Sequence, residues 1–163
     1  MRYAKIRKFD VSNGPGVRTT LFVSGCSHKC EGCFNVEAQS FSYGEIWNED
    51  IEKEFMSYVK NPNIVGVNIL GGEPMEQDET LNNLLIKIKE TGKDIWLWSG
   101  YTFEEIIDSS KKLKLLSLVD VLIDGKFELE NRDLMLKYRG SKNQRIINVK
   151  DSLKENKLVL MNI

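Results

Sequence analysis

The chain has 163 residues, 41% of them hydrophobic and 29% charged, with a formal net charge of -1 and a pI near 6.0. This composition suits one globular domain over residues 1–163 and gives no general electrostatic attraction to nucleic acid. The N-terminus lacks the apolar stretch of a secretory signal, and no apolar run approaches the roughly 20 residues that cross a bilayer. We therefore expect a cytoplasmic protein that binds neither nucleic acid nor a membrane.

Strand and helix patterns alternate along the chain. The apolar run over 19–23 predicts a strand, and the residues up to Val11 are expected to pair beside it. Three similar apolar runs predict the other core strands: 64–70, 94–98 and 119–123. Helix patterns separate these strands, and they begin near Asn48, Leu81 and Thr102. Strands that alternate with helices form right-handed βαβ units, so we predict an α/β fold with a mainly parallel sheet.

A distinctive motif follows each of the four predicted core strands. The four motifs are the cysteine loop 26–33, Gly71-Gly72-Glu73-Pro74, Ser99-Gly100-Tyr101 and Asp124-Gly125-Lys126. The carboxyl ends of parallel strands share one edge of a sheet, so we expect all four motifs to converge on one site. A closed eight-stranded barrel takes about 250 residues. The shorter chain therefore predicts an open, partial barrel that leaves one side free for a large partner.

All three cysteines of the chain, Cys26, Cys30 and Cys33, form a single CxxxCxxC pattern. An odd number of closely spaced cysteines does not form a disulfide framework, and unpaired thiols fit a reducing compartment. Three thiolates can hold three irons of a [4Fe–4S] cluster and leave the fourth iron open to a small molecule. The alternative is a structural zinc site completed by His28, the only histidine.

The motifs after the later strands suggest a site for an α-amino acid. Gly71 and Gly72 allow a close approach to the backbone, and Glu73 supplies a carboxylate for an ammonium group. Lys126 can meet a carboxylate from the other side, and Asp124 offers an anion for an amine, a hydroxyl or a metal ion. Each residue taken alone is equally compatible with a plain turn or a solvated charge. Their expected common edge is what favours a site.

These ordered motifs resemble those of radical S-adenosylmethionine activating enzymes, and most closely the activators of the anaerobic, class III ribonucleoside-triphosphate reductase. The resemblance covers nearly the whole chain and rests on six segments: 9–18, 21–26, 31–35, 96–101, 121–127 and 139–145. In the wider superfamily an aromatic residue commonly precedes the third cysteine. Here Gly32 precedes it and Phe34 follows it, which is similar to the reductase activators.

The resemblance implies a partial (β/α) barrel of the radical S-adenosylmethionine type, with one [4Fe–4S] cluster on the three cysteines. It implies S-adenosylmethionine as a second cofactor, held by Phe34, Gly71, Gly72, Glu73, Ser99, Tyr101, Asp124 and Lys126. Reduced flavodoxin or a similar donor would supply one electron to cleave it into methionine and a 5′-deoxyadenosyl radical. That radical would take the α-hydrogen of a glycine in the reductase, and no catalytic side chain beyond the cluster and this site is implied.

Two other functions remain open on the sequence alone. One is an activase of another glycyl-radical enzyme, of the pyruvate formate-lyase type, or a small radical enzyme acting on a metabolite. The other is a zinc-stabilised binding module without catalysis. Arg18 and segment 139–145 are characteristic of the resembling family, but arginines also form ordinary ion pairs, so both roles are kept for them.

Overall fold

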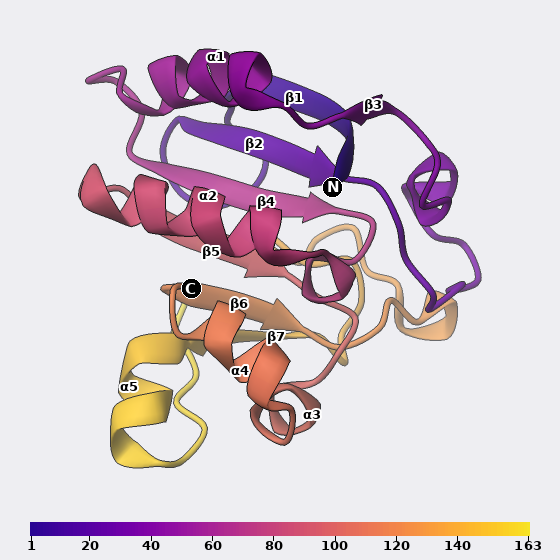
Figure 1. Cartoon of the computed structure of the whole chain (residues 1–163). Coiled ribbons are helices and arrows are strands. Elements are labelled where there is room, and N and C mark those ends of the chain that lie inside the picture. Colours follow the sequence, from indigo (N-terminus) through magenta and orange to yellow (C-terminus); the bar gives the residue numbers. More distant parts are fainter.

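Seven strands form one open sheet in the order β3-β1-β2-β4-β5-β6-β7 in the computed structural model, which describes residues 1–163 (Figure 1). The strands are β1 Arg2–Asp10, β2 Arg18–Val23, β3 Glu45–Ile46, β4 Gly66–Gly71, β5 Asp94–Trp98, β6 Val121–Asp124 and β7 Arg145–Asn148. The central strands β2, β4, β5 and β6 are parallel, while β1, β3 and β7 pair antiparallel. The predicted α/β fold, with a parallel core and an unclosed sheet, is confirmed.

The helices begin where capping side chains stand. They are α1 Glu49–Val59, α2 Glu79–Glu90, α3 Phe103–Ile107, α4 Ser110–Leu116 and α5 Val149–Glu155, with short 3-10 helices η1 Val36–Gln39, η2 Pro74–Glu76 and η3 Leu129–Asn131. Asn48 accepts a hydrogen bond from the Ile51 N–H at the start of α1, and Thr102 forms both bonds of the predicted capping box. None of these helices has the length and apolar character needed to cross a membrane.

The two faces of the sheet differ in how they are covered. Helices α1 and α2 pack side by side over one face (Figure 1), which carries the larger group of buried side chains, including Leu21, Ile69 and Leu97. The other face carries a smaller group: Trp96, Val121, Ile123 and Ile146, with Trp98 and Tyr138 against it. Successive strand residues point to opposite faces, so neighbours Trp96 and Leu97 belong to different groups. The less covered face is the one that faces the cysteines.

Two elements at the C-terminal side were not expected from the sequence. Strand β7 adds antiparallel to β6 and buries Ile146 and Ile147, and α5 follows it directly. Basic residues outnumber acidic ones between Lys137 and Lys157, and the apolar part of β7 is only two residues long, so the sequence pattern did not indicate a strand there. A strand this short is specified by its pairing with β6 rather than by its own pattern.

Arg18 lies inside the fold rather than in the cysteine site. Its Nε donates to Asn68 Oδ1 at 2.7 Å, its Nη2 donates to Asp94 Oδ1 at 2.5 Å, and its guanidinium stacks over the Trp96 ring at 5.4 Å. The side chain is 1% exposed. These contacts connect β2 with β4 and β5. Of the two roles kept open for Arg18, a functional contact or an ordinary ion pair, the structure shows the ion pair.

Candidate metal and cofactor site

A cavity of about 480 Å³ brings together the cysteine loop and the loops that follow β4 and β5. All three cysteines line it, together with five of the eight residues predicted to hold S-adenosylmethionine: Phe34, Gly71, Gly72, Glu73 and Ser99. The other three predicted residues, Tyr101, Asp124 and Lys126, are not part of its lining. All four motifs therefore contribute to one cavity at the carboxyl edge of the sheet, as expected. The motif after β6 contributes only Gly125.

The cysteine loop is irregular and is held by backbone contacts on both sides. Gly25 N–H donates to Ala38 O at 2.7 Å, Cys26 N–H to Gln39 O at 3.0 Å, and Cys33 N–H to Cys30 O at 3.2 Å. Gly32 has φ +74°, and a Cβ there would lie 2.9 Å from Leu129 Cδ1. The left-handed backbone at Gly32 favours glycine over an aromatic residue before Cys33, and a side chain there would also have to displace Leu129.

The environment of Cys26 and Cys30 favours the protonated form of their thiols. Burial raises the pKa of the Cys26 thiol to about 11, and the nearby carboxylates of Glu73 and Glu76 add to this. Burial and the neighbouring Cys33 raise the pKa of Cys30, against a lowering by the charge of Lys126. Metal ligation needs thiolates, so binding iron at neutral pH must release protons from these sulfurs.

The spacing of the ligand atoms favours a cluster over a single zinc ion. Cys26, His28 and Glu76 have ligand atoms within 4.8 Å of one another, and the three sulfurs do not form such a group. Zinc binds thiolates at about 2.3 Å, which would draw three sulfurs to within about 4 Å. In addition, His28 Nε2 faces Glu73 Oε2 at 2.8 Å. Three thiols that do not meet around one point fit a group with several irons better than the three-sulfur, one-histidine zinc site.

Glu73 is the most heavily hydrogen-bonded carboxylate of the site. Its Oε1 accepts from Met75 N–H at 2.9 Å and Ser99 Oγ at 2.7 Å, and its Oε2 accepts from His28 Nε2 at 2.8 Å and Gly100 N–H at 2.7 Å. The residue is 1% exposed. Four donors occupy the approximately four lone-pair sites of a carboxylate. An ammonium group would therefore share Glu73 with donors from the chain itself.

The two glycines before Glu73 are required by close backbone contacts. A Cβ on Gly71 would lie 2.5 Å from Val23 O, and one on Gly72 would lie 2.5 Å from Gly25 O. Gly71 also has φ +107°. The glycines thus let the loop after β4 pack against the start of the cysteine loop. This packing gives them a structural role in addition to the cofactor role predicted for them.

Tyr101 and Ser99 lie on the loop after β5, where each contacts a glutamate. Ser99 is nearly buried and donates to Glu73, while the Tyr101 hydroxyl donates to Glu76 Oε2 at 3.2 Å. Burial raises the pKa of Glu76, but hydrogen bonds from Ser27 and Tyr101 outweigh it and leave the pKa below its usual value. Tyr101 stands edge-on to the His28 ring, with centroids 4.6 Å apart.

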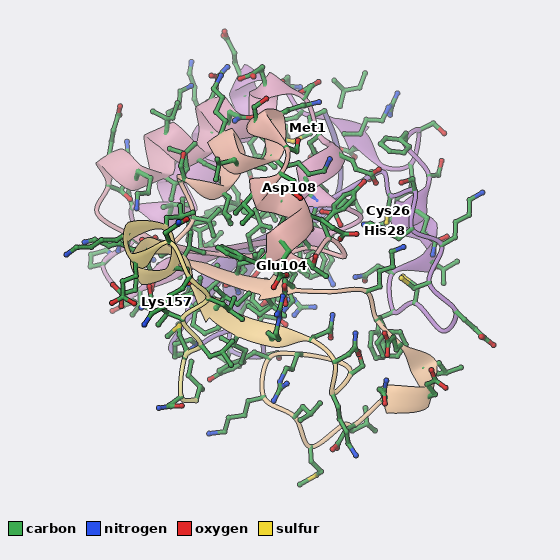
Figure 2. All side chains as sticks on the ribbon, turned by 90° about the horizontal axis from the view of Figure 1, so that it is seen from below. Met1, Cys26, His28, Glu104, Asp108 and Lys157 are labelled. Atoms are coloured by element: carbon green, nitrogen blue, oxygen red, sulfur yellow. The ribbon has the colours of Figure 1, made fainter.

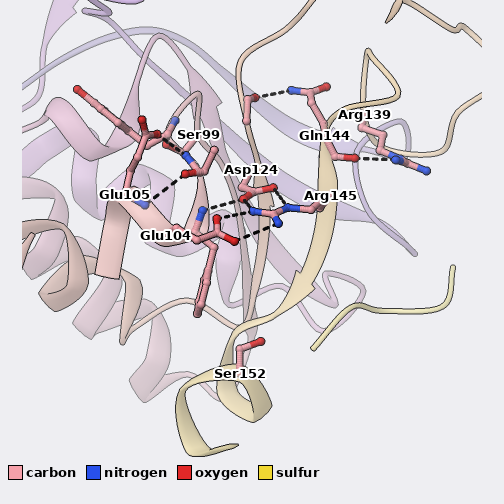
Figure 3. Close-up of polar contacts among 12 residues, drawn as sticks. Ser99, Glu104, Glu105, Asp124, Arg139, Gln144, Arg145 and Ser152 are labelled. Carbon is pink, nitrogen blue, oxygen red and sulfur yellow. Dashed lines mark hydrogen bonds and ion pairs between the residues drawn. The ribbon is translucent and has the colours of Figure 1, made fainter. Parts of the chain in front are cut away.

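Asp124 lies beside the site and not within its wall. Its carboxylate accepts from the Phe103 N–H at 2.7 Å and from Arg145 Nε and Nη2 at 3.0 and 2.5 Å (Figure 3). Arg145 also pairs with Glu104, and this strengthens the charge network. Asp124 is 1% exposed, so an added amine or cation would have to compete with Arg145 for it. Lys126, by contrast, is exposed and has no ion pair.

Several lining residues of the cavity were not among the predicted cofactor contacts. Phe127, Tyr138, Arg139 and Gln144 belong to the long connection between β6 and β7, which folds back over the less covered face. Phe34 packs against Phe127 with ring centroids 4.9 Å apart and the ring planes tilted by 58°, and a Cβ on Gly140 would meet the Phe34 ring at 2.9 Å. The sequence signals for this wall were the matches over 121–127, which contains Phe127, and over 139–145, which contains Arg139 and Gln144.

Known proteins match the chain over most of its length. The family described as a 4Fe-4S single cluster domain matches residues 12–147. The anaerobic ribonucleoside-triphosphate reductase-activating protein of Enterobacteria phage T4 is 42% identical over 150 residues, covering 90% of this chain and 93% of the relative. The proteins of the same name from Vibrio cholerae and Escherichia coli K12 are 42% and 35% identical, each covering 88% of this chain and 96% of the relative.

This chain belongs to the anaerobic ribonucleoside-triphosphate reductase-activating protein family. The resemblance found in the sequence motifs is therefore confirmed, and so is the presence of a 4Fe–4S domain. Cys26, Cys30 and Cys33 are all the cysteines of the chain, and all three line the cavity. Figure 2 shows Cys26 and His28 side by side at one edge of the molecule.

Proposed function

We propose that this chain activates an anaerobic ribonucleoside-triphosphate reductase by generating a glycyl radical on it with S-adenosylmethionine. The observation that carries the proposal is the cavity that joins the three cysteines of a 4Fe–4S domain to the glycine and glutamate motif after β4. The names of the relatives supply the partner, since they describe reductase-activating proteins. We further propose that residues 1–163 form one radical S-adenosylmethionine domain with a partial barrel.

Cys26, Cys30 and Cys33 are the proposed ligands of one [4Fe–4S] cluster. Three thiolates leave one iron without a protein ligand, open to a small molecule. When bound, the cluster supplies the electron that cleaves S-adenosylmethionine, and the resulting 5′-deoxyadenosyl radical takes the glycine α-hydrogen. Reduced flavodoxin or a similar protein is the proposed electron source.

The chain's own residues bind and orient S-adenosylmethionine in this proposal. The backbone of Gly71 and Gly72 and the Glu73 carboxylate would face the amine, and Ser99 and Tyr101 would lie near the ribose or adenine. Phe34 lines the same cavity as Ser99. Lys126 is the proposed partner of the methionine carboxylate. Tyr101 and Asp124 remain predicted contacts. The Tyr101 hydroxyl donates to Glu76 and can still accept a hydrogen bond, whereas a ligand amine would compete with Arg145 for Asp124.

The walls of the cavity also limit what can react inside it. Phe22, Leu70, Trp98 and Tyr138 contribute apolar surface on the less covered face, and Phe34, next to Cys33 in the chain, adds a further aromatic side chain to the lining. Apolar walls keep water away from a reactive radical, which is the protein's main task when a cofactor carries out the difficult step. The sheet stays open toward this face, so a glycine-bearing loop of the reductase can enter beside the cluster.

The proposed function is tested by mixing the reconstituted protein anaerobically with reductant, S-adenosylmethionine and the reductase of the same organism. The expected result is a glycyl radical, seen as a doublet in electron paramagnetic resonance. Deuterium placed on the glycine α-carbon should appear in 5′-deoxyadenosine. Cleavage of S-adenosylmethionine without any protein radical would instead indicate a metabolite enzyme. A doublet on pyruvate formate-lyase but not on the reductase would assign the chain to the other activase class.

A further inference from the structure

We propose that His28 is a positioning residue that couples the cysteine loop to the S-adenosylmethionine site by holding Glu73 and the loop after β5 in place. The inference rests on the proposed function for its ligand, and it gives the only histidine of the chain a role distinct from metal binding. It is carried by contacts that His28 makes with two other loops.

His28 reaches from the metal-binding segment to the centre of the neighbouring site. It lies between Cys26 and Cys30, and its Nε2 is 2.8 Å from Glu73 Oε2, 45 residues further along the chain. Both side chains are nearly buried, with 6% and 1% exposure. A carboxylate only accepts hydrogen bonds, so Nε2 carries the hydrogen and donates it.

The same carboxylate oxygen also accepts a hydrogen bond from the loop after β5. Gly100 N–H donates to Glu73 Oε2 at 2.7 Å, beside the His28 contact, while Ser99 Oγ donates to Oε1 at 2.7 Å. Glu73 thus connects the cysteine loop with the loop that carries the predicted ribose and adenine contacts. Removal of one donor from a buried carboxylate leaves the remaining bonds free to rearrange.

Packing reinforces this hydrogen bond. A Cβ placed on Gly100 would lie 2.6 Å from His28 Cδ2 and 2.7 Å from its Nε2, so the ring rests directly on the Gly100 backbone. Tyr101 closes the other side of the ring, edge-on at 4.6 Å. The position of the His28 ring is therefore determined by two consecutive residues of the loop after β5.

A second, parallel connection lies at the neighbouring residue of the cysteine loop. Ser27 N–H and Oγ donate to the two oxygens of Glu76 at 2.8 and 2.5 Å, and Tyr101 donates to the same glutamate. Ser27 is exposed, whereas His28 is nearly buried. The Ser27 contact can keep the loop attached when His28 is replaced, so loss of His28 should change geometry without unfolding the site.

Four variants test the proposal: His28→Ala, His28→Gln, Gly100→Ala and the control Glu31→Gln, an exposed change between Cys30 and Cys33. After reconstitution, iron content should equal that of the wild type in all four, because every cysteine is kept. Calorimetry with S-adenosylmethionine should show about tenfold weaker binding for His28→Ala, the lower end of what losing a hydrogen bond to a charged group produces. His28→Gln, whose amide can donate to Glu73, should recover most of the affinity.

Gly100→Ala provides an independent route to the same effect, because the added methyl group displaces the ring and removes no polar group. Gly100 does not need a left-handed backbone, so alanine introduces no strain in φ. We expect its affinity for S-adenosylmethionine to fall as in His28→Ala. In the cofactor-free protein, amide hydrogen exchange at Gly100 should be faster in His28→Ala than in Glu31→Gln.

Three results would overturn the inference. The first is wild-type affinity for S-adenosylmethionine and wild-type amide exchange at position 100 in both His28→Ala and Gly100→Ala. The second is failure of His28→Gln to restore any of the affinity lost in His28→Ala. The third is loss of iron in His28→Ala, which would make His28 a ligand. If His28→Ala does not fold, wild-type affinity in Gly100→Ala has the same meaning. A wild-type protein that binds no S-adenosylmethionine would refute the proposed function instead, and the exchange measurement still decides whether His28 holds Gly100.

Discussion

At the scale of single residues, the buried carboxylates of this protein act as hubs for hydrogen bonds. Glu73 gathers donors from three segments, and Asp124 joins the start of α3 to β7. Asp10 accepts from Ser12 N–H, Asn13 Nδ2 and Thr20 Oγ1 and so shapes the turn after β1. Burying a carboxylate is unfavourable unless its oxygens are satisfied, which explains why each one has several partners.

Replacing any one cysteine should prevent the cluster from assembling. Cys26→Ala, Cys30→Ala and Cys33→Ala each leave two thiols, and the chain has no spare cysteine to substitute. Iron and sulfide content and the visible absorption of the reconstituted protein should drop in each variant. If all three variants retain wild-type iron and cleave S-adenosylmethionine, these residues are not the ligands.

Lys126→Ala should weaken S-adenosylmethionine binding while the iron content stays the same. The exposed ammonium group is the proposed partner of the methionine carboxylate, and losing a charge-assisted hydrogen bond costs about 1.5–3 kcal/mol, or roughly tenfold to hundredfold in affinity. Lys142→Ala is the matched control, because Lys142 is also exposed and lies further along the same connection. Equal affinities of the two variants by calorimetry would remove Lys126 from the site.

Acid should destabilise the cofactor-free protein partly through Asp10. Burial raises the pKa of Asp10, but hydrogen bonds from Thr20, Asn13 and Ser12 and the charge of Arg7 outweigh it and hold the pKa below its usual value. A lowered folded-state pKa gives stability that is present above the unfolded-state pKa and is lost as pH falls through the folded-state pKa. The free energy of unfolding in urea should therefore decline below about pH 4. Asp10→Asn should make this decline shallower, and an unchanged slope would contradict the assignment.

At the scale of elements, one arginine links the edge strand β7 to β6 and to α3 through its side chain. Arg145 is the first residue of β7, and its side chain binds Asp124 at the end of β6 and Glu104 in α3, as Figure 3 shows. Segment 139–145 thus contains two arginines with different surroundings. Arg139 lines the cavity and donates to the Gln144 carbonyl at 2.6 Å, and it has no carboxylate within ion-pair distance. Only the tertiary structure distinguishes the two.

Arg145→Ala should destabilise the fold, because it leaves the buried Asp124 carboxylate with a single donor from Phe103. We expect a loss of about 2–3 kcal/mol in the free energy of unfolding, below the range for fully buried pairs because Arg145 is partly exposed. Arg145→Lys keeps the charge without the forked geometry and should lie between wild type and alanine. Urea unfolding of the cofactor-free proteins measures both. Identical stabilities for alanine and wild type would refute the structural role.

At the scale of the whole molecule, helices cover one face of the sheet and the connection between β6 and β7 lies over the other (Figure 1). Leu134 and Met135 stand at the tip of this connection with 76% and 89% exposure. Leu134 also lines the cavity that contains the cysteines. We expect the reductase to contact these two adjacent apolar side chains, because Leu134 borders the cavity that a glycine-bearing loop would enter.

Replacing both residues, as in Leu134→Ser with Met135→Ser, should reduce radical transfer to the reductase. Met135→Ser alone should leave cleavage of S-adenosylmethionine without the reductase unchanged, because Met135, unlike Leu134, does not line the cavity. Ile86→Ser is the matched control, because Ile86 is 45% exposed on α2 at the helix-covered face. Glycyl radical yield by electron paramagnetic resonance is the measurement. Equal yields for the double variant and the control would show that the tip does not contact the reductase.

The sequence by itself was sufficient for the parallel core, the cysteine site and the family, because these depend on short patterns. Strand runs such as 94–98, the cap at Asn48 and the spacing of Cys26, Cys30 and Cys33 are visible within a few residues. Which charged side chains are engaged was decided only by the tertiary structure. Glu73 meets Gly100 27 residues away, Asp124 meets Arg145 21 residues away, and Arg18 meets Asp94 76 residues away. No local pattern encodes such partners, since they meet only when separate strands have paired and buried them.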